Sequence, residues 1–129
     1  MTVRYYETDR MGIVHHSNYL RWFEVGRTEL IKMVGFRYSE LEKGGLLLPV
    51  VESHCQYRGS ARYEDEIVVK ATVKSMTPVR ITFYYEVFNE TAGKLITSGE
   101  TMHVWTNSEL KPVNLKKTAP EIYRMMGGQ

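Results

Sequence analysis

The residues best suited to chemistry lie near the amino terminus, in the stretch YYETDRMGIVHHSNYLRWFE (residues 5–24). An acid, Asp9, is followed by Gly12 and then by two adjacent histidines, and all of them precede an apolar pattern with helical spacing. The first turn of a helix carries unpaired backbone N–H groups and about half a positive charge, so it can hold and polarise a partly negative oxygen. The stretch is therefore the first place to look for chemistry on a negative or partly negative oxygen.

One long helix is predicted to position these groups. Ser17 or Asn18 suits the N-cap, apolar residues recur at helical spacing over residues 19–34, and Gly35 suits the position just after the last turn. Gly26 falls inside the apolar stripe, where glycine costs about 1 kcal/mol relative to alanine. Close approach of another backbone is the usual compensation, so we expect the helix to lie tightly against a sheet.

Strand patterns occupy most of the remaining chain. A short first strand is expected in residues 2–8, and alternating apolar residues predict strands within residues 46–57, 66–76, 80–88 and 94–106. Gly99 is expected at a bulge or at a contact with the helix. The short turns between the strands imply antiparallel neighbours. The pattern predicts an α+β fold of about five antiparallel strands around one central helix, which is the hotdog fold in outline, although other α+β folds stay open on pattern alone.

Composition favours a single globular domain over residues 1–129, because 43% of the residues are apolar and 25% are charged. The net charge of +2 is spread along the chain, which argues against nucleic-acid binding. A single cysteine, Cys55, fits a reducing compartment, and we find neither a signal peptide nor an apolar run of membrane-spanning length, so we expect a cytoplasmic protein without membrane insertion. A protomer this small buries about two-thirds of its unfolded surface, so self-association is expected.

The opening stretch also carries a family resemblance, through a gap-free run of matching residues: Asp9, Gly12, Ile13, Val14, Asn18, Tyr19, Trp22, Phe23 and Glu24, continued by Arg27, Thr28 and Glu29. This run resembles the N-terminal signature of the 4-hydroxybenzoyl-CoA thioesterase family of hotdog proteins, and most nearly its YbgC-like acyl-CoA thioesterase branch. Weaker similarity covers nearly the whole chain, including YRGSARYEDEIVV at residues 57–69.

The resemblance implies hydrolysis of acyl-CoA thioesters without a metal or an organic cofactor. In this family the residue at the Asp9 position is the catalytic carboxylate, acting as nucleophile or as general base toward water, and the residue at the His16 position gives its backbone N–H to the thioester carbonyl. The resemblance further implies an active site at a dimer interface and dimers that often pair into tetramers. We expect further substrate contacts from residues of the same stretch: Gly12, Val14, His15, Asn18 and Tyr19.

Basic residues near predicted strand ends are the candidates to bind the phosphates of coenzyme A: Arg58, Arg62, Lys74 and Arg80. A solvated sheet edge would explain them equally well. Relatives that act on 4-hydroxybenzoyl-CoA carry paired arginines around the hairpin that is KSMTPVR here (residues 74–80), and this chain lacks that pair. The sequence therefore gives no reason to expect that this chain makes the phosphate contacts of those relatives or acts on the same acyl group.

Other residues carry weaker alternatives. His15 and His16 lack nearby metal ligands at zinc spacing, so a metal pair is not expected. Glu24 is the second candidate for the catalytic carboxylate, although an ion pair with Arg21 or Arg27 on the same helix explains it more simply. Neighbours on a strand face opposite ways, so His54 and Cys55 are not expected to form a catalytic pair.

Two further questions stay open on sequence alone. His103 and Trp105 share one strand face and either line a pocket or pack in the core. A non-hydrolytic module that binds acyl-CoA or an acyl carrier protein is the alternative function, whereas the motifs of hotdog dehydratases are not found. The sequence does not define the acyl group.

Overall fold

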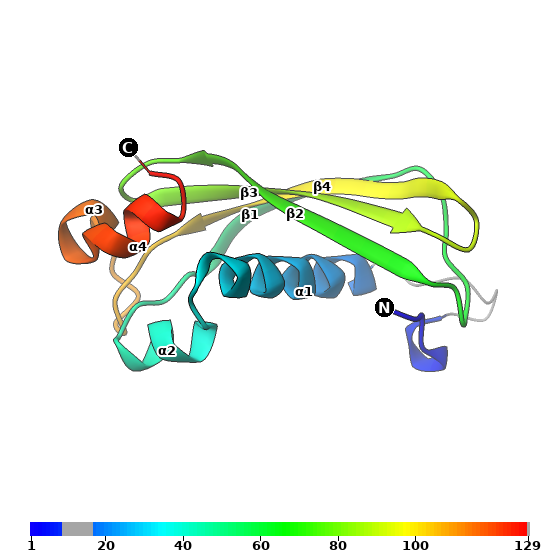
Figure 1. Ribbon diagram of the computed structural model, residues 1–129, viewed down its shortest axis with the longest axis horizontal. Helices are drawn as coiled ribbons and strands as arrows, with labels where there is room; N and C mark the ends of the chain where they lie inside the picture. Colours follow the sequence, from blue (N-terminus) through cyan, green and yellow to red (C-terminus); the bar gives the residue numbers. More distant parts are fainter. Residues whose placement is uncertain (9–16, 129) are drawn as a thin grey trace.

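The computed structural model describes residues 1–8 and 17–128 and has one long helix lying along one face of a four-stranded antiparallel sheet (Figure 1). The helices are α1 (Ser17–Val34), α2 (Tyr38–Lys43), α3 (Leu115–Thr118) and α4 (Pro120–Met125), with a short 3-10 helix at Tyr5–Glu7. The strands are β1 (Val50–Tyr57), β2 (Ile67–Met76), β3 (Arg80–Asn89) and β4 (Lys94–Val104), in the spatial order β1-β4-β3-β2. This arrangement confirms the predicted α+β hotdog fold.

The amino-terminal segment is the main departure from the predicted elements. The strand expected over residues 2–8 is reduced to isolated bridge residues at Thr2, which pairs with Glu66, and at Thr8, with the 3-10 helix between them. The cause is local, because the Glu7 carboxylate accepts a hydrogen bond from the Arg4 backbone N–H at 2.9 Å and so stabilises a turn. The described residues therefore form four strands where about five were expected.

Helix α1 ends after Val34 as predicted, but it already includes Ser17 and Asn18, which were expected at its N-cap. Gly35 ends it with a positive φ of 119°, and the Gly35 and Phe36 N–H groups both donate to the Ile31 carbonyl, as in a glycine-terminated helix. The apolar face of α1 packs on the sheet, where the Phe23 ring stacks on Tyr85 with centroids 4.4 Å apart. Among the helices of the described ranges, no helix is long and apolar enough to span a membrane.

Two glycines allow α1 to approach the sheet closely. A Cβ added at Gly26 would lie 2.8 Å from Val69 Cγ1, which confirms the predicted close approach of this part of the helix. A Cβ at Gly99 would lie 2.5 Å from the His54 carbonyl oxygen and 2.7 Å from the Phe23 ring. Gly99 is thus a contact with the helix, and the irregularities in β4 pairing lie elsewhere.

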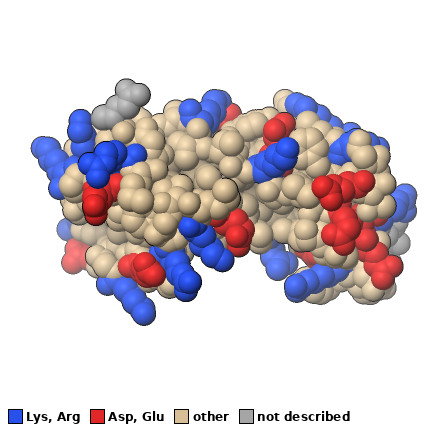
Figure 2. All heavy atoms as spheres, in the orientation of Figure 1, with Lys and Arg blue, Asp and Glu red and all other residues tan. Residues whose placement is uncertain are grey.

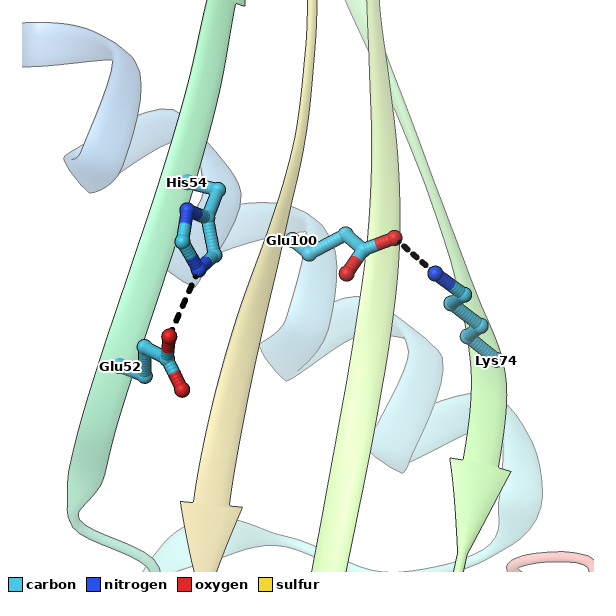
Figure 3. A network of polar contacts seen from close by, with 4 residues as sticks. All are labelled: Glu52, His54, Lys74 and Glu100. Atoms are coloured by element: carbon cyan, nitrogen blue, oxygen red, sulfur yellow. Dashed lines mark hydrogen bonds and ion pairs between the residues drawn. The ribbon is translucent and has the colours of Figure 1, made fainter.

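The sheet face turned away from α1 carries charged pairs. His54 and Glu52 lie 2.9 Å apart on β1, and Lys74 of β2 pairs with Glu100 of β4 (Figure 3). These pairs are largely exposed, so they contribute little to stability. The sheet therefore has one apolar face under α1 and one polar, solvated face.

Strand β1 forms an edge of the sheet and is mostly exposed. It pairs with β4 on one side only. Three of its large apolar side chains reach solvent: Val50 at 50%, Val51 at 55% and Tyr57 at 43%. An eight-residue edge strand with exposed apolar side chains is a ready surface for pairing with another strand.

We predict that Gly99→Ala lowers the free energy of unfolding by about 1 to 3 kcal/mol, because the added methyl group would push Phe23 or β1 out of place. Gly44→Ala is the matched control, since a Cβ there has no atom closer than 3.5 Å and φ is −78°. Urea unfolding measures the free energy of unfolding of both variants. Equal stability of the two variants would contradict the tight contact between α1 and the sheet.

Candidate active site

The central prediction falls on residues whose placement the structure does not describe. Asp9, Gly12, Val14, His15 and His16 all lie outside the described residues. The structure does describe the residues that flank this segment (residues 9–16): the chain up to Thr8, and α1 from Ser17 onward. The other predicted substrate residues are described: Asn18, Tyr19, Arg58, Arg62 and Arg80.

The two sides of the segment are tied together by Glu7 and Asn18. The Asn18 side-chain amide donates to the Glu7 carbonyl at 3.0 Å. The Glu7 carboxylate is 5% exposed and accepts hydrogen bonds from the Trp22 indole N–H at 2.8 Å and from the Arg4 N–H at 2.9 Å. The chain that leads to Asp9 is therefore held against the first two turns of α1, which follow His16.

Sequence reasoning missed Glu7. A signal was present, because a glutamate three residues after a turn-starting residue is typical of a capping box, and Glu7 stands in that relation to Arg4. Burying a carboxylate is costly unless it is fully hydrogen-bonded, so this arrangement fixes Glu7 in one orientation.

An aromatic cluster lies beside the start of α1. Tyr19 is 1% exposed, and its ring lies 5.1 Å from Trp22 and 5.4 Å from Tyr57, measured between centroids. Tyr57 is at the end of β1 and stays partly exposed. Partial burial, with the neighbouring Cys55, raises the pKa of Tyr57 to about 12, so its hydroxyl is protonated at neutral pH. Tyr19 and Trp22 are buried in the core, and Tyr57 is the ring of this cluster that reaches solvent.

The three candidate arginines do not gather in one protomer. Arg58 directly follows β1 and Arg62 precedes β2, so both lie at the end of the sheet where Tyr57 contacts Tyr19 of α1. Arg80 begins β3 and is paired with Val104 at the opposite end. Strands of this length span roughly 30 Å at about 3.3 Å per residue. A single chain therefore presents Arg58 and Arg62 near the start of α1, and Arg80 far from it.

Lys74, the fourth basic candidate, already pairs with Glu100 on the polar face of the sheet (Figure 3). Glu24, the second candidate carboxylate, is exposed on α1. The expected ion pair of Glu24 with Arg21 or Arg27 is absent among the described residues, because Arg21 donates to Asn18 and Arg27 turns inward.

The structure also decides the remaining alternatives. His54 lies on the polar face with Glu52, whereas Cys55 packs against the core, which confirms that they do not form a catalytic pair (Figure 3). Burial raises the pKa of the Cys55 thiol, so it stays protonated. His103 and Trp105 are 0% and 1% exposed, so they pack in the core. Within the described part of the chain, no group of three or more His, Cys, Asp or Glu side chains could hold a metal ion.

A chain of buried polar groups runs between α1 and the sheet. Arg27 is 7% exposed and donates to the hydroxyls of Tyr85 at 2.9 Å and Tyr38 at 3.3 Å. The Tyr85 hydroxyl bonds to that of Thr101 at 2.5 Å, and Thr101 lies 2.8 Å from His103 Nε2. Burial raises the pKa of both tyrosines, so Arg27 has only neutral partners among the described residues.

Comparison with known proteins adds a family match. The model of the thioesterase-like superfamily matches residues 3–122. The "Putative acyl-CoA thioesterase YneP" of Bacillus subtilis is 41% identical over 120 residues, which cover 92% of this chain and 86% of that protein. The acyl-CoA thioester hydrolase YbgC of Escherichia coli O157:H7 is 26% identical over 117 residues, which cover 90% of this chain and 87% of that protein.

Solved structures agree with this match. A crystal structure of a DHNA-CoA thioesterase from Staphylococcus aureus superposes with a TM-score of 0.93 at 36% sequence identity. The alignment covers 97% of this chain and 84% of that chain. A hypothetical protein from Aquifex aeolicus superposes with a TM-score of 0.86 at 34% identity, covering 95% of this chain and 94% of that chain.

We predict that the protein loses stability as pH falls from about 6.5 toward 4, because burial lowers the pKa of His103 from 6.5 to about 4. In that window the unfolded chain binds a proton at His103 that the folded chain does not, so the free energy of unfolding falls by up to about 1.4 kcal/mol per pH unit. Denaturant unfolding at several pH values measures the slope.

The variant His103→Gln removes this contribution, and the exposed His54→Gln is its control. We expect a shallower pH dependence between about 4 and 6.5 for His103→Gln only. The same slope in all three proteins would show that His103 titrates normally in the folded state.

Proposed function

The chain belongs to the thioesterase-like superfamily, and on that basis we propose that it is an acyl-CoA thioesterase that hydrolyses the thioester of a short-to-medium or aromatic acyl-CoA. Relatives support the reaction class, since the Bacillus subtilis and Staphylococcus aureus proteins carry thioesterase names at 41% and 36% identity. The name of the Staphylococcus aureus relative, a DHNA-CoA thioesterase, supports an aromatic acyl group.

We assign the catalytic carboxylate to Asp9 and the carbonyl-polarising backbone N–H to His16. The observation that carries this assignment is the link between Glu7 and Asn18, which holds the chain on both sides of the segment at the start of α1. An N–H donor at a helix start stabilises the oxyanion without reorganising, and the loss of one such donor typically costs about 2.7 to 4 kcal/mol.

The proposed reaction needs only water as co-substrate. Asp9 acts as general base or as nucleophile, so that oxygen from water finally bonds to the carbonyl carbon and the C–S bond breaks. The sulfur leaves and takes up a proton as the free thiol of coenzyme A, and the acyl group leaves as a carboxylic acid. No metal or organic cofactor takes part in the proposed chemistry.

We further propose that two copies pair through their β1 edges, with dimers pairing again into tetramers. The exposed apolar side chains of this edge strand support the first step. Antiparallel pairing about a two-fold axis would place the start of one β1 beside the end of the other. Arg80 of one copy would then approach the end of the second copy that carries Arg58 and Arg62. The proposed location is the cytoplasm, which the single cysteine supports.

We predict that Asp9→Asn lowers kcat by about a hundredfold or more, because an amide cannot act as base or nucleophile. Glu24→Gln is the matched comparison, and we expect its kcat to stay within about threefold of wild type. Release of coenzyme A thiol from a panel of short, long and aromatic acyl-CoAs measures both variants. Normal turnover by Asp9→Asn, or loss of turnover in Glu24→Gln alone, would refute the assignment; tight binding of acyl-CoA without thiol release would favour the binding module.

We predict that Val51→Glu weakens self-association, because the two-fold axis would bring two new carboxylates close together on the β1 edge. Analytical ultracentrifugation should show a smaller species, and thioesterase activity should fall with it. Met33→Glu is the control, since Met33 is 84% exposed on α1, away from this edge. An unchanged mass for Val51→Glu would place the interface elsewhere.

A further inference from the structure

A groove lies between the amino-terminal segment and the solvent-facing side of α1. Its volume is about 1030 Å³, and its walls come from residues 1–7, from Arg21 and Val25 of α1, and from the turn at Tyr63. Figure 2 shows a hollow along the lower edge of the molecule, bordered by atoms of basic side chains. The resemblance and the comparisons assign no role to this groove.

Two arginines face one tyrosine at one end of the groove. The guanidinium carbons of Arg4 and Arg21 each lie 6.0 Å from the centre of the Tyr6 ring, and Arg4 also donates to the Tyr6 hydroxyl at 3.0 Å. No carboxylate of the described residues lies within 4 Å of either guanidinium group. Hydrogen bonds from Arg4 and then from Arg21 lower the pKa of Tyr6, which reports the positive potential at this point.

Exposed aromatic rings form another part of the same groove. Tyr5 is 75% exposed, and Tyr63 is 52% exposed. Their ring centroids lie 5.7 Å apart in an edge-to-face arrangement, and this contact covers only one face of one ring. Faces of this kind are available for stacking by a planar ligand, since base–aromatic stacking needs only one free ring face.

The groove adjoins the residues that anchor the catalytic segment. Arg21 donates to the Asn18 side chain at 3.3 Å, and the Arg4 backbone N–H donates to the Glu7 carboxylate. Asn18 and Glu7 are the two residues that tie the chain on both sides of residues 9–16. The paired arginines therefore contact the two described residues that flank the segment carrying the proposed catalytic groups.

Acidic residues lie along the rest of the groove: Glu24, Glu29 and Glu64. Glu29 pairs with Lys32 at 3.6 Å. These carboxylates repel a phosphate group, whereas they accept hydrogen bonds from hydroxyl or amino groups. The charge distribution therefore fits a ligand with a phosphate at one end and a neutral, hydrogen-bonding aromatic part.

We infer that this groove binds the nucleotide end of the coenzyme A substrate, with Arg4 and Arg21 on its phosphate groups and Tyr5 and Tyr63 against the adenine. This inference rests on the proposed thioesterase function. It differs from the earlier expectation for Arg58, which donates to Gln56 at 2.7 Å on the open end of β1. A bidentate guanidinium–phosphate contact is the strong form of this interaction, and Arg4 and Arg21 bring two guanidinium groups to one ring, that of Tyr6.

The test compares an acyl-CoA with the matching acyl-pantetheine, which has the same thioester but no nucleotide. For the double variant Arg4→Ala/Arg21→Ala we expect KM for the acyl-CoA to rise about tenfold or more with kcat within about twofold, and KM for the acyl-pantetheine to stay within about twofold. Adenosine 3′,5′-bisphosphate should inhibit the wild type competitively, and the double variant should weaken this inhibition by a similar factor.

Further variants control for folding and for a rival site. Tyr63→Ala leaves the Glu7 contacts intact and should raise KM about threefold for the acyl-CoA only. Arg37→Ala, at the start of α2, should leave KM unchanged for both substrates. Thermal melts establish that each variant is folded.

Two kinetic results would overturn the inference. Equal changes for both substrates would mean that the groove does not contact the nucleotide. A selective rise in KM for Arg58→Ala/Arg62→Ala, with none for Arg4→Ala/Arg21→Ala, would place the nucleotide at the end of β1. If the wild type hydrolyses neither substrate, the proposed function fails. Calorimetry with adenosine 3′,5′-bisphosphate then still tests the groove, because the wild type should bind this nucleotide more tightly than the double variant does, and equal binding would overturn the inference.

Discussion

The close contact between α1 and the sheet is the constraint on which the rest of the structure depends. Gly26 and Gly99 leave no room for a Cβ atom, so the helix lies directly against β2 at Gly26 and packs its Phe23 ring on β4 at Gly99. This contact fixes the height and the rotation of α1, and with them the position of its first turn. A carbonyl-polarising N–H at a helix start is useful only if the helix cannot shift, because small displacements weaken the hydrogen bond to a developing oxyanion. In the proposed mechanism, packing at the middle of the helix would therefore control the chemistry at its beginning.

The buried polar chain has a related but different effect. Apolar packing of Phe23 on Tyr85 would allow the helix to slide along the sheet at low cost, since apolar contacts have little directionality. The hydrogen bonds from Arg27 to Tyr85 and Tyr38 oppose such sliding, because each hydrogen bond has a preferred distance and angle. A cation buried among neutral hydroxyls is expensive to desolvate. We interpret its presence as a device that fixes the register of α1 against β3 and α2, at some cost in stability.

Sequence reasoning predicted the elements whose patterns are regular and long. The end of α1, the antiparallel strands and the close approach at Gly26 followed from periodicity and from the positions of two glycines, Gly26 and Gly35. It failed where a single side chain overrides a local pattern, as at Glu7, whose carboxylate turns a strand-like segment into a 3-10 helix. It could not bring Arg4 and Arg21 together around Tyr6, because that contact joins two elements across a loop and depends on their three-dimensional arrangement.

The distribution of basic residues shows why one chain's sequence leaves the proposed site incomplete. Arg58 and Arg62 lie at the end of the sheet where α1 begins, and Arg80 lies at the other end of the same sheet. If two copies pair through their β1 edges about a two-fold axis, the end of one sheet that carries Arg80 lies beside the end of the other that carries Arg58 and Arg62. The start of α1 in each copy would then face residues from both copies. The groove beside Tyr6 needs no second copy, since its arginines and tyrosines all belong to one chain. In this proposed division, the nucleotide is recognised within a protomer, whereas the acyl group meets the surface between protomers, which can vary without disturbing either the helix start or the phosphate contacts.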